Sequence, residues 1–400
     1  MTRKTHVHPS DIAGLTRLAT DVTREVTDLA EALHKTIASS PGIGGTPMEQ
    51  RASGIAGFVY KTIRGVTGLV DGTTDSVVSE YGAALNEEST PEREAMLAIV
   101  NGVMGDRLEA NGNPLAIAMR LRRKGKELKV EREALSKAFR APRNKLLVMV
   151  HGLCMNDLQW ARKGSDFGAA LERDLGYTVV HLHYNSGLHT STNGRGFAGL
   201  LEALVQQWPE PLEELAMLTH SMGGLVARSA YYYGTVGGQA WPRHLRKLIF
   251  LGTPHHGSML ERGGNLIDIS LGVSPYSAPF ARLGKLRSAG ITDLRHGNVL
   301  DEDWQGIDRF EPVGDRRHPA PLPEGVRCYA IAANIGKQAG GLIGDGMVPV
   351  SSALGQHEDP RLALSFAPSR QWVGYGMNHW ALLREAAVYE QVRRWLGERE

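Results

Sequence analysis

Apolar residues in the first part of the chain recur every three or four positions, which is the spacing of one face of an α-helix. Three such series run through residues 10–39, 55–69 and 96–108. Ser10 and Asp11 stand at the start of the first series, and both residue types cap helix N-termini. The pattern therefore predicts a helical N-terminal region over residues 1–112.

The polar face of the first series bears on what this region contacts. An amphipathic helix can lie on a membrane or a lipid inclusion, but it more often packs against its own protein. Acids and bases are mixed along the polar face, as in Asp21, Arg24, Glu25, Asp28 and Glu31. Helices that bind anionic lipid carry an excess of Lys and Arg instead. We favour packing within the protein and keep peripheral contact with a membrane or a lipid inclusion as the alternative.

The hydrophobic pattern changes to alternation after residue 117. Met119 and Leu121 alternate with polar residues, as do Leu128 and Val130, and the "RKGK" between the two pairs has the composition of a tight turn. This pattern predicts a β-hairpin at which the sheet begins. The basic residues here could attract phosphates, but we interpret them as the solvated face of an edge hairpin.

Short apolar runs then follow, each with the length of a buried parallel strand. They are "KLLVMV" ending at Val150, "YTVVHL" ending at Leu182, "LAMLT" ending at Thr219, "KLIFL" ending at Leu251 and "VRCYAIAA" ending at Ala333. Helical stretches such as "FGAALERDL", "GFAGLLEALVQQW" and "GGLVARSAYYYG" lie between them. This alternation predicts an α/β fold with a mostly parallel, doubly wound sheet over residues 113–400.

Charge and cysteine content bear on partners and compartment. The chain has 45 Lys and Arg against 43 Asp and Glu, so no field of one sign favours nucleic acid as a partner. Cys154 and Cys328 lie far apart, which fits a reduced compartment better than a disulfide framework. The first residues lack the apolar centre of a secretory signal, and no apolar run approaches the ~18 residues of a membrane span. We therefore expect a cytoplasmic protein that does not bind nucleic acid.

A serine stands where one of the predicted strands gives way to a predicted helix. In "LTHSMGG", at 218–224, Ser221 follows the apolar run and precedes a helical stretch. This context is typical of a nucleophile elbow, a tight turn that projects the serine hydroxyl above the sheet. Gly223 and Gly224 allow the strand and helix backbones to approach, whereas Thr219 occupies the position where G-x-S-x-G has its first glycine.

The elbow is one of four motifs that occur together in the second part of the chain. They are "VMVHGL" at 148–153, "THSMGGLVAR" at 219–228, "LGTPHHGS" at 251–258, and "GDGMVPVSSA" at 344–353 with "NHWALL" at 378–383. In this order the chain resembles the α/β-hydrolase superfamily, close to bacterial lipases and esterases and to the deacylases of glycolipid anchors. The resemblance implies an α/β-hydrolase fold, to which residues 1–112 add a helical N-terminal extension.

A serine hydroxyl needs a base to accept its proton, and the base needs an acid to hold its tautomer. In the superfamily the acid and then the histidine follow the serine in sequence. Asp345 and His379 match these two positions. The resemblance also assigns the oxyanion hole to the backbone amides of Leu153 and Met222.

Other histidines and acids are weaker candidates for the catalytic roles. Neighbouring side chains at an elbow point apart, so we expect packing or turn support from His220. His255 and His256 follow a strand on the active-site side and are expected to line the entrance. The sequence "HLHYNSGLHTSTNG" over 181–194 lacks the usual ligands of a zinc site, so we expect polar packing there, a turn ending at Asn193 and no metal. The acids Asp293, Asp303 and Asp308 are expected to be solvated or to cap helices.

A long segment rich in Gly, Ser, Arg and Pro runs over residues 254–323. Insertions at this edge of the sheet often act as lids. The resemblance to lipases suggests that the segment helps to form an acyl-binding pocket, and a small helical cap packed on the core is the structural alternative. The predicted substrate-binding residues are His255, Leu266, Ile267, Tyr276 and Phe280.

The main functional hypothesis is a carboxylic-ester hydrolase that forms an acyl-enzyme on Ser221 and needs no cofactor. Its substrate would be a small-molecule or lipid ester. The same chemistry cleaves thioesters, polyesters and some amides, so these remain alternatives. A hydrolase-like scaffold that binds lipid, an inclusion surface or a partner without turnover is the alternative outside the enzymes. The sequence does not indicate the acyl length, the physiological substrate or the oligomeric state.

Overall fold

The computed structural model describes residues 10, 11, 14, 89–139, 141–162, 165–258, 287–311, 314–337 and 344–398. The apolar series over 10–39, apart from residues 10, 11 and 14, and the series over 55–69 therefore lie outside the described residues. Residues 259–286 of the segment 254–323 lie outside them too. The boundary expected at residue 112 stays a prediction.

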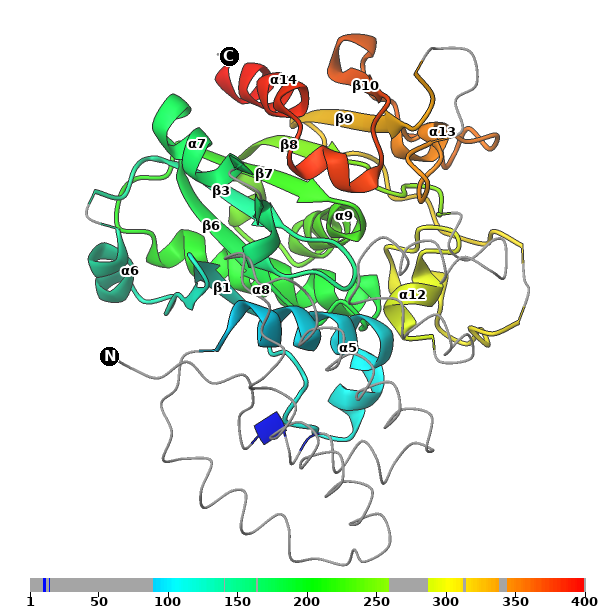
Figure 1. Ribbon diagram of the computed structural model, residues 1–400, viewed down its shortest axis with the longest axis horizontal. Coiled ribbons are helices and arrows are strands. Elements are labelled where there is room, and N and C mark those ends of the chain that lie inside the picture. Colours follow the sequence, from blue (N-terminus) through cyan, green and yellow to red (C-terminus); the bar gives the residue numbers. More distant parts are fainter. Residues whose placement is uncertain are drawn as a thin grey trace, which may run out of the picture.

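A central sheet of eight strands organises the described part, in the order β10-β9-β8-β7-β3-β6-β1-β2 (Figure 1). Every neighbouring pair from β10 to β6 is parallel, and β1 runs antiparallel to both of its neighbours, β6 and β2. The strands are β1 Arg120–Arg123, β2 Lys126–Glu127, β3 Lys145–Val150, β6 Thr178–His183, β7 Glu214–His220, β8 Leu245–Leu251, β9 Arg327–Asn334 and β10 Gln371–Tyr375, with β4 Ala161–Arg162 and β5 Ser165–Asp166 in a separate hairpin. The predicted mostly parallel sheet is confirmed.

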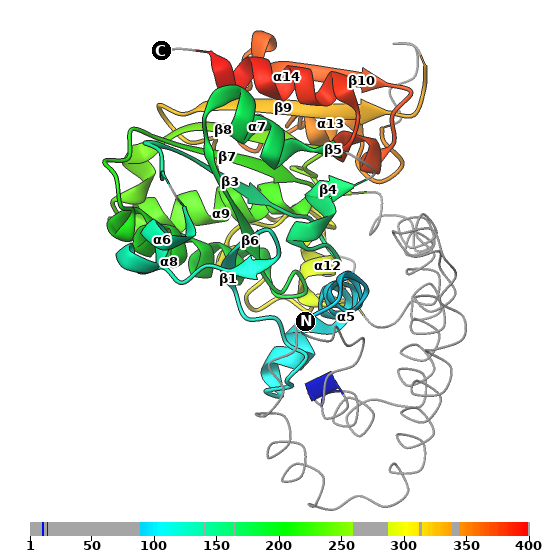
Figure 2. The same cartoon turned by 60° about the vertical axis from the view of Figure 1, so that its left-hand side comes forward.

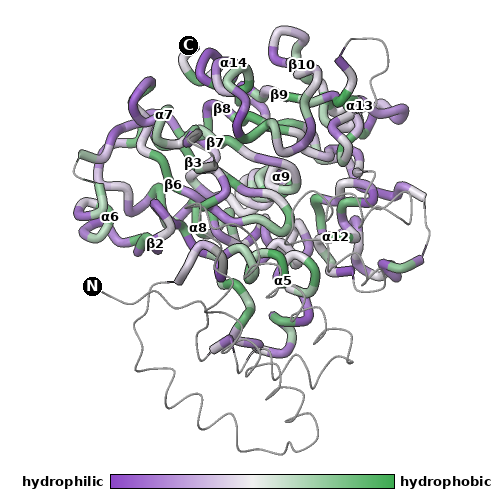
Figure 3. The backbone as a smooth tube through the Cα atoms, in the orientation of Figure 1, coloured by the Kyte–Doolittle hydropathy of each residue, from purple (hydrophilic) through white to green (hydrophobic). Residues whose placement is uncertain are grey.

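The central strands are buried on both faces, which is why they read as unbroken apolar runs. In β3, Leu146, Val148 and Val150 belong to one hydrophobic cluster, while Leu147 and Met149 belong to another on the opposite face. Figure 3 colours the strands of the sheet by the hydropathy of their residues. Alternate side chains of a strand point to opposite faces, so one strand feeds both layers of the core.

Helices cover both faces of the sheet (Figure 2). Helices α8 and α9 pack on one face through residues such as Phe197 and Val226, and α7 and α14 pack on the other through Leu171 and Val392. The helices are α5 Pro91–Ala110, α6 Arg132–Ala138, α7 Phe167–Leu175, α8 Thr190–Gln207, α9 Met222–Val236, α12 Ala289–Asp293, α13 Val350–Ala353 and α14 Ala386–Gly397. Short 3₁₀ turns are η1 Asp157–Trp160, η2 Trp241–His244, η4 Asp301–Asp303, η5 Pro368–Arg370 and η6 His379–Leu383. This three-layer arrangement is the doubly wound architecture expected from the alternating pattern.

Helix α5 is the third predicted N-terminal series. The Thr90 side chain caps it by accepting a hydrogen bond from the Arg93 amide at 3.2 Å, and Pro91 occupies the first turn, where no intrahelical donor is lost. Its apolar positions Met96, Ile99, Val103 and Leu108 are all buried. The helix lies across the molecule beside α12 (Figure 1). None of the described helices is long and apolar enough to cross a membrane.

Two local expectations are wrong. Asn193 does not end a turn: it lies inside α8, because Asp293 accepts a hydrogen bond from the Thr190 amide at 2.7 Å and so caps an earlier helix start. Arg122 is not on a solvated face, because α5 covers it and Glu94 of that helix pairs with it at 2.7 Å. The reason in both cases is a partner distant in sequence.

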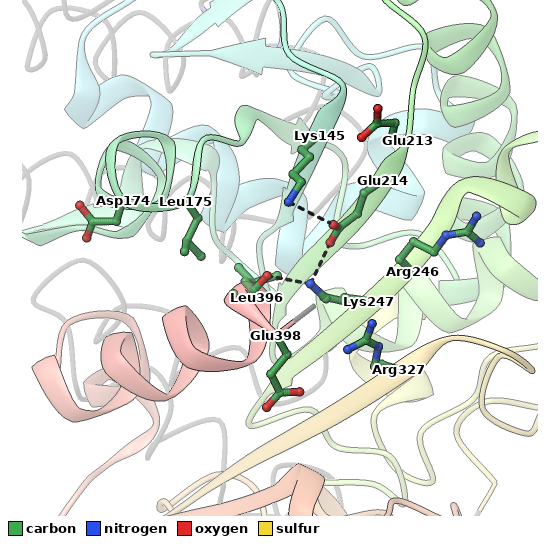
Figure 4. A pocket seen from close by; sticks show the side chains of 11 residues that line it. Lys145, Asp174, Leu175, Glu213, Glu214, Arg246, Lys247, Arg327, Leu396 and Glu398 are labelled. Atoms are coloured by element: carbon green, nitrogen blue, oxygen red, sulfur yellow. Dashed lines mark hydrogen bonds and ion pairs between the residues drawn. The ribbon is translucent and has the colours of Figure 1, made fainter. Parts of the chain in front are cut away.

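The amino ends of β3, β7 and β8 form a cavity of about 630 Å³ together with the end of α14 (Figure 4). Lys247 Nζ lies 3.2 Å from Glu214 Oε1 and donates to the Leu396 carbonyl at 2.7 Å. The Tyr177 hydroxyl donates to Glu214 at 2.5 Å, and Lys145 approaches the same carboxylate at 3.9 Å. Burial lowers the pKa of Lys247, although Glu214 acts in the opposite direction. These contacts fasten the C-terminal end of α14 to the sheet.

Candidate active site

Ser221 lies at the turn between β7 and α9, with φ of 53° and ψ of −129°. Positive φ is costly for a residue with a Cβ, and among the described residues it occurs outside glycine only at Lys124, Cys154 and Ser221. Two backbone hydrogen bonds hold the turn: the Ser221 amide donates to Leu251 O at 2.8 Å, and the Gly224 amide donates to Ser221 O at 3.0 Å. The strained turn is thus fixed by the neighbouring strand and by its own helix.

Glycines let the backbones meet at this turn. A Cβ on Gly223 would lie 2.5 Å from His151 O, and one on Gly224 would overlap Thr253 Oγ1. Thr219, in contrast, fits where the motif has its first glycine, because its hydroxyl donates to Ile249 O at 3.0 Å. The departure from the motif therefore leaves the elbow intact.

Asp345 and His379 form a buried pair. His379 Nδ1 lies 2.6 Å from Asp345 Oδ2, and the His379 amide donates to Asp345 O at 3.1 Å. The other carboxylate oxygen, Oδ1, accepts from the amides of Met347 and Val348 at 2.9 and 2.7 Å. Since the carboxylate faces Nδ1 as an acceptor, Nδ1 carries the proton and Nε2 keeps a lone pair.

The free nitrogen of His379 lies on the same side as the elbow. Nε2 is buried and makes no hydrogen bond within the part of the chain that the structure describes, so the Ser221–His379 bond is not formed. The two residues flank one stretch of backbone: Ser221 bonds Leu251 O, and a Cβ on the next residue, Gly252, would lie 3.2 Å from His379 Cε1. In free enzymes this nucleophile–base bond is often long and tightens when substrate binds.

The predicted oxyanion donors also lie beside the serine. Met222 is the first residue of α9, where helix amides have no intrahelical acceptor. Gly152 approaches so closely that a Cβ on it would lie 2.9 Å from Ser221 Cβ, which brings the adjoining Leu153 to the elbow. The Tyr184 hydroxyl donates to His151 O at 2.8 Å and holds the start of this loop.

His220 contacts His379 rather than the serine. The two rings are 4.6 Å apart, and His220 Nε2 lies 3.3 Å from His379 O. Burial, reinforced by the nearby His379, lowers the pKa of His220 well below its ordinary value. His220 is therefore a neutral side chain that packs against His379.

The predicted substrate-binding residues are only partly described. His255 is buried, with its ring 4.7 Å from that of Phe250 and 5.6 Å from that of Phe366. Burial, with Arg228 as the next cause, lowers its pKa well below the ordinary value. The other four, Leu266, Ile267, Tyr276 and Phe280, lie outside the described residues. A substrate role for these five residues stays a prediction.

Two arginines near the site were missed by sequence reasoning. Arg228, one helical turn and a half along α9, is buried and donates to Ala320 O, and burial lowers its pKa to about 9. Arg317 donates to His255 O at 2.8 Å. Arg228 was visible as the last residue of "THSMGGLVAR", but nothing in the sequence locates Arg317 beside the "HH" of the next motif.

The three acids that were weaker candidates than Asp345 accept hydrogen bonds from backbone amides. Asp293 accepts from the Thr190 amide at 2.7 Å, and Asp303 accepts from those of Val299 and Leu300 at 2.9 and 3.0 Å. Asp308 accepts from the Phe310 amide at 2.9 Å. Among the described residues, no group of three His, Cys, Asp or Glu side chains is arranged to hold a metal ion.

Comparisons with known proteins place this geometry in context. Residues 198–319 match the family described as PGAP1-like alpha/beta domain, and no curated protein matches the chain. The structure is similar to mature Bacillus licheniformis lipase BlEst2, with 18% identity, a TM-score of 0.42 and coverage of 64% of this chain and 94% of that one. It is also similar to Aspergillus fumigatus lipase B, with 12% identity, a TM-score of 0.46 and coverage of 98% and 85%. It is similar as well to phospholipase PlaB from Legionella pneumophila, with 18% identity, a TM-score of 0.35 and coverage of 52% of this chain and 45% of that one.

Proposed function

We propose that this chain is a serine hydrolase that cleaves carboxylic esters. Its mostly parallel sheet, its strand–serine–helix turn and the family match over residues 198–319 support the proposal. The observation that carries the proposal is the buried Asp345–His379 pair: His379 Nε2 has no hydrogen bond to the described residues, and His379 flanks the same Leu251–Gly252 backbone as Ser221, which is held at positive φ. Strain and an unpaired buried nitrogen both cost stability, so a catalytic use explains their presence.

The reaction follows from these positions. Ser221 Oγ attacks the ester carbonyl while His379 Nε2 takes its proton, and Asp345 stabilises the resulting imidazolium. The amides of Leu153 and Met222 donate to the developing oxyanion, and such donors contribute roughly 3 kcal/mol each. Collapse of the intermediate expels the alcohol, which receives the proton from His379. Water activated by the same imidazole then releases the acid and restores Ser221.

Several substrate classes besides simple esters fit the proposed mechanism. Thioesters, polyesters and some amides pass through the same tetrahedral intermediate, so the substrate range is decided by the pocket rather than by the triad. We propose a small-molecule or lipid ester with no cofactor and no nucleic-acid partner. Peripheral contact of the N-terminal region with a membrane or a lipid inclusion and a cytoplasmic location stay predictions.

The test combines ester profiling with active-site labelling. Wild-type protein is assayed with p-nitrophenyl esters of increasing acyl length and treated with a fluorophosphonate probe. Ser221→Ala is expected to lose turnover and labelling while its circular dichroism spectrum is unchanged. Ser351→Ala, at an exposed serine of α13, is the matched control and is expected to keep both. Turnover by purified Ser221→Ala at the wild-type rate would contradict the proposal.

A non-catalytic scaffold gives a different result in the same experiment. It would leave the wild-type protein unlabelled by the probe and inactive on every ester, although the protein is folded. That outcome would reject the enzyme and leave binding as the function.

A further inference from the structure

Helix α5 belongs to the N-terminal region, yet it packs against the loops that surround the elbow. Its contacts involve the loop after β3, which carries Leu153, the loop after β6, and α12 (Figures 1 and 2). Ser288 donates to Gly102 O at 2.6 Å, and the Ala289 amide donates to Asp106 at 3.1 Å. The helix is thus in contact with two loops and with α12 at the end of the sheet where Ser221 lies.

The closest of these contacts joins Gly102 to Cys154, the residue after Leu153. A Cβ on Gly102 would overlap Cys154 Sγ and would lie 2.9 Å from both the Cα and the amide nitrogen of Cys154. Cys154 itself has a positive φ of 57°, which is unusual for a residue with a side chain. The helix backbone therefore lies directly against the strained loop that presents the Leu153 amide.

The same loop is held from its other side. The Cys154 amide donates to Ser186 Oγ at 3.1 Å, and Ser186 is buried. The neighbouring Asn185 donates to Gly105 O of α5 at 2.9 Å. A Cβ on Gly105 would lie 2.6 Å from Asn185 Cγ, so this contact also requires glycine. Cys154 is thus enclosed between α5 and the loop after β6.

A buried ionic contact fastens the far end of the loop to the same helix. Arg122 Nη1 lies 2.7 Å from Glu94 Oε2 and 3.0 Å from Asp157 Oδ1. Glu94 is on α5, and Asp157 is three residues beyond Cys154 in the chain. All three side chains are at most 11% exposed, so water screens the contact little. The segment 153–157 is therefore held to α5 directly at Cys154 and, through Arg122 of β1, at Asp157.

We propose that α5, through Gly102, is a positioning element that sets the place of the Leu153 amide in the oxyanion hole. The inference rests on the proposed function, since it needs a reaction in which this amide stabilises negative charge. Gly102 acts through Cys154 and touches no reacting atom. An oxyanion donor must lie within a few tenths of an ångström of its place, and a 1 Å displacement can cost about 100-fold in rate.

The central test is Gly102→Ala, which places a methyl group against Cys154. We expect kcat to fall about 10- to 100-fold, with KM changed less than about threefold, because the lost interaction forms in the transition state. The pH at which activity is half-maximal should stay unchanged, because the Asp345–His379 pair lies elsewhere. Gly199→Ala is the matched control: it also lies within a helix, but its Cβ would meet nothing within 4 Å.

A second substitution tests whether the effect passes through Cys154. Cys154→Gly removes the Sγ that the new methyl group would overlap, and glycine accepts the φ of 57°. In the double variant Gly102→Ala with Cys154→Gly, kcat should recover partly, about fivefold relative to Gly102→Ala, because the Cα and amide nitrogen of residue 154 still lie against the new methyl group. Such non-additivity is expected of residues in contact. Additive losses would overturn the route through Cys154 and with it the proposal.

The outcomes separate this inference from the proposed function. A wild-type protein that neither hydrolyses esters nor reacts with a fluorophosphonate rejects the function itself. An active wild type whose folded Gly102→Ala variant keeps its kcat overturns only the positioning role. If Gly102→Ala does not fold, Cys154→Ala decides, because it removes the Sγ that lies against Gly102 and Ile99 O of α5 and keeps a Cβ on the strained backbone. A fall in kcat of about threefold or more supports the proposal, and an unchanged kcat overturns it.

Discussion

The two ends of the same parallel strands contrast sharply in how their polar groups are used. At the amino ends, a cavity of about 630 Å³ contains Lys247 and Glu214, whose charges are paired with each other. At the carboxyl ends, Ser221 is held at positive φ and Nε2 of His379 is buried without a hydrogen bond to the described residues. The cavity therefore lies where the charges are paired, and the residues proposed to be catalytic lie at the opposite ends of the strands.

This contrast separates a structural network from the arrangement that we propose to be reactive. Glu214 and Lys247 each have an opposite charge beside them, whatever the volume of the cavity. A strained backbone and an unpaired nitrogen lower stability, and proteins keep such features where function requires them. The four predictions below test the contrast, from the largest expected effect to the smallest.

Exchanging a carboxylate for its amide should affect kcat very differently at the carboxyl ends and at the amino ends of the strands. Asp345→Asn keeps an oxygen for the amides of Met347 and Val348, but its NH₂ group would face His379 Nδ1 and favour the wrong tautomer. We expect kcat to fall about 10³- to 10⁴-fold with the fold retained. Glu214→Gln at the amino ends should leave kcat within about twofold. The kcat values are measured from initial rates on an ester. Similar losses of kcat in both variants would show that the two ends of the strands do not differ in their role.

Acid should destabilise the protein through histidines at the carboxyl ends. Burial lowers the pKa of His151 to about 4, whereas an unfolded histidine titrates near 6.5. Between these values the unfolded state binds more protons, so the free energy of unfolding falls as pH falls from about 6.5 to 4. The loss from His151 is roughly 3 kcal/mol.

The corresponding measurement is urea unfolding at pH 7.5 and at pH 4.5. His151→Phe should lower stability at both values but reduce the difference between them. His318→Phe, which replaces a side chain that is 56% exposed, is the control and should keep the wild-type difference. A His151→Phe variant with the wild-type pH dependence would show that this imidazole is not held neutral.

Removing one charge from the amino-end network should affect stability and spare activity. Lys247→Met removes the partner of Glu214 and the donor to Leu396 O, and leaves a buried carboxylate with fewer partners. We expect a loss of about 2 kcal/mol in the free energy of unfolding and a kcat within about twofold. Lys137→Met, at a side chain that is 75% exposed, should change stability by less than about 0.5 kcal/mol. Denaturant titration measures the free energy of unfolding of the wild type, Lys247→Met and Lys137→Met, and ester assays measure their kcat. A large loss of kcat in Lys247→Met would contradict the prediction.

The smallest expected effect concerns the backbone of the elbow. Glycine adopts positive φ without the steric penalty of a Cβ, so Ser221→Gly should be more stable than Ser221→Ala by about 1 kcal/mol. Both variants lack the hydroxyl, which removes side-chain chemistry from the comparison. Thermal unfolding measures the difference, and equal melting temperatures would show that the turn stores no strain.

The central strands could be predicted because each is buried on both faces. "KLLVMV" coincides with β3 Lys145–Val150, and "KLIFL" ends with β8 at Leu251. The sequence also indicated the elbow, because a strand, a small-residue turn and a helix follow one another locally. The buried contact between Asp345 and His379 agrees with positions that the resemblance implied, whereas their catalytic roles remain to be tested.

Features that depend on distant partners could not be predicted. Helix α8 begins before Asn193 because Asp293, far along the chain, caps it. Arg122 is buried because Glu94 of α5 reaches it. The edge strand β10 Gln371–Tyr375 has only half-buried residues at its start and so lacks the apolar run that marked the others. Each case combines a weak local pattern with a specific tertiary contact.

The order of these residues along the chain has a consequence for biosynthesis. Ser221 and the loop that carries Leu153 are translated before the stretch with Asp345 and His379. Strands β9 and β10 add sequentially to the edge formed by β8, and the imidazole follows β10. A nascent polypeptide on the ribosome therefore carries the elbow before it carries His379. Under the proposed mechanism, the Ser221 hydroxyl has no base to activate it until the segment after β10 has docked.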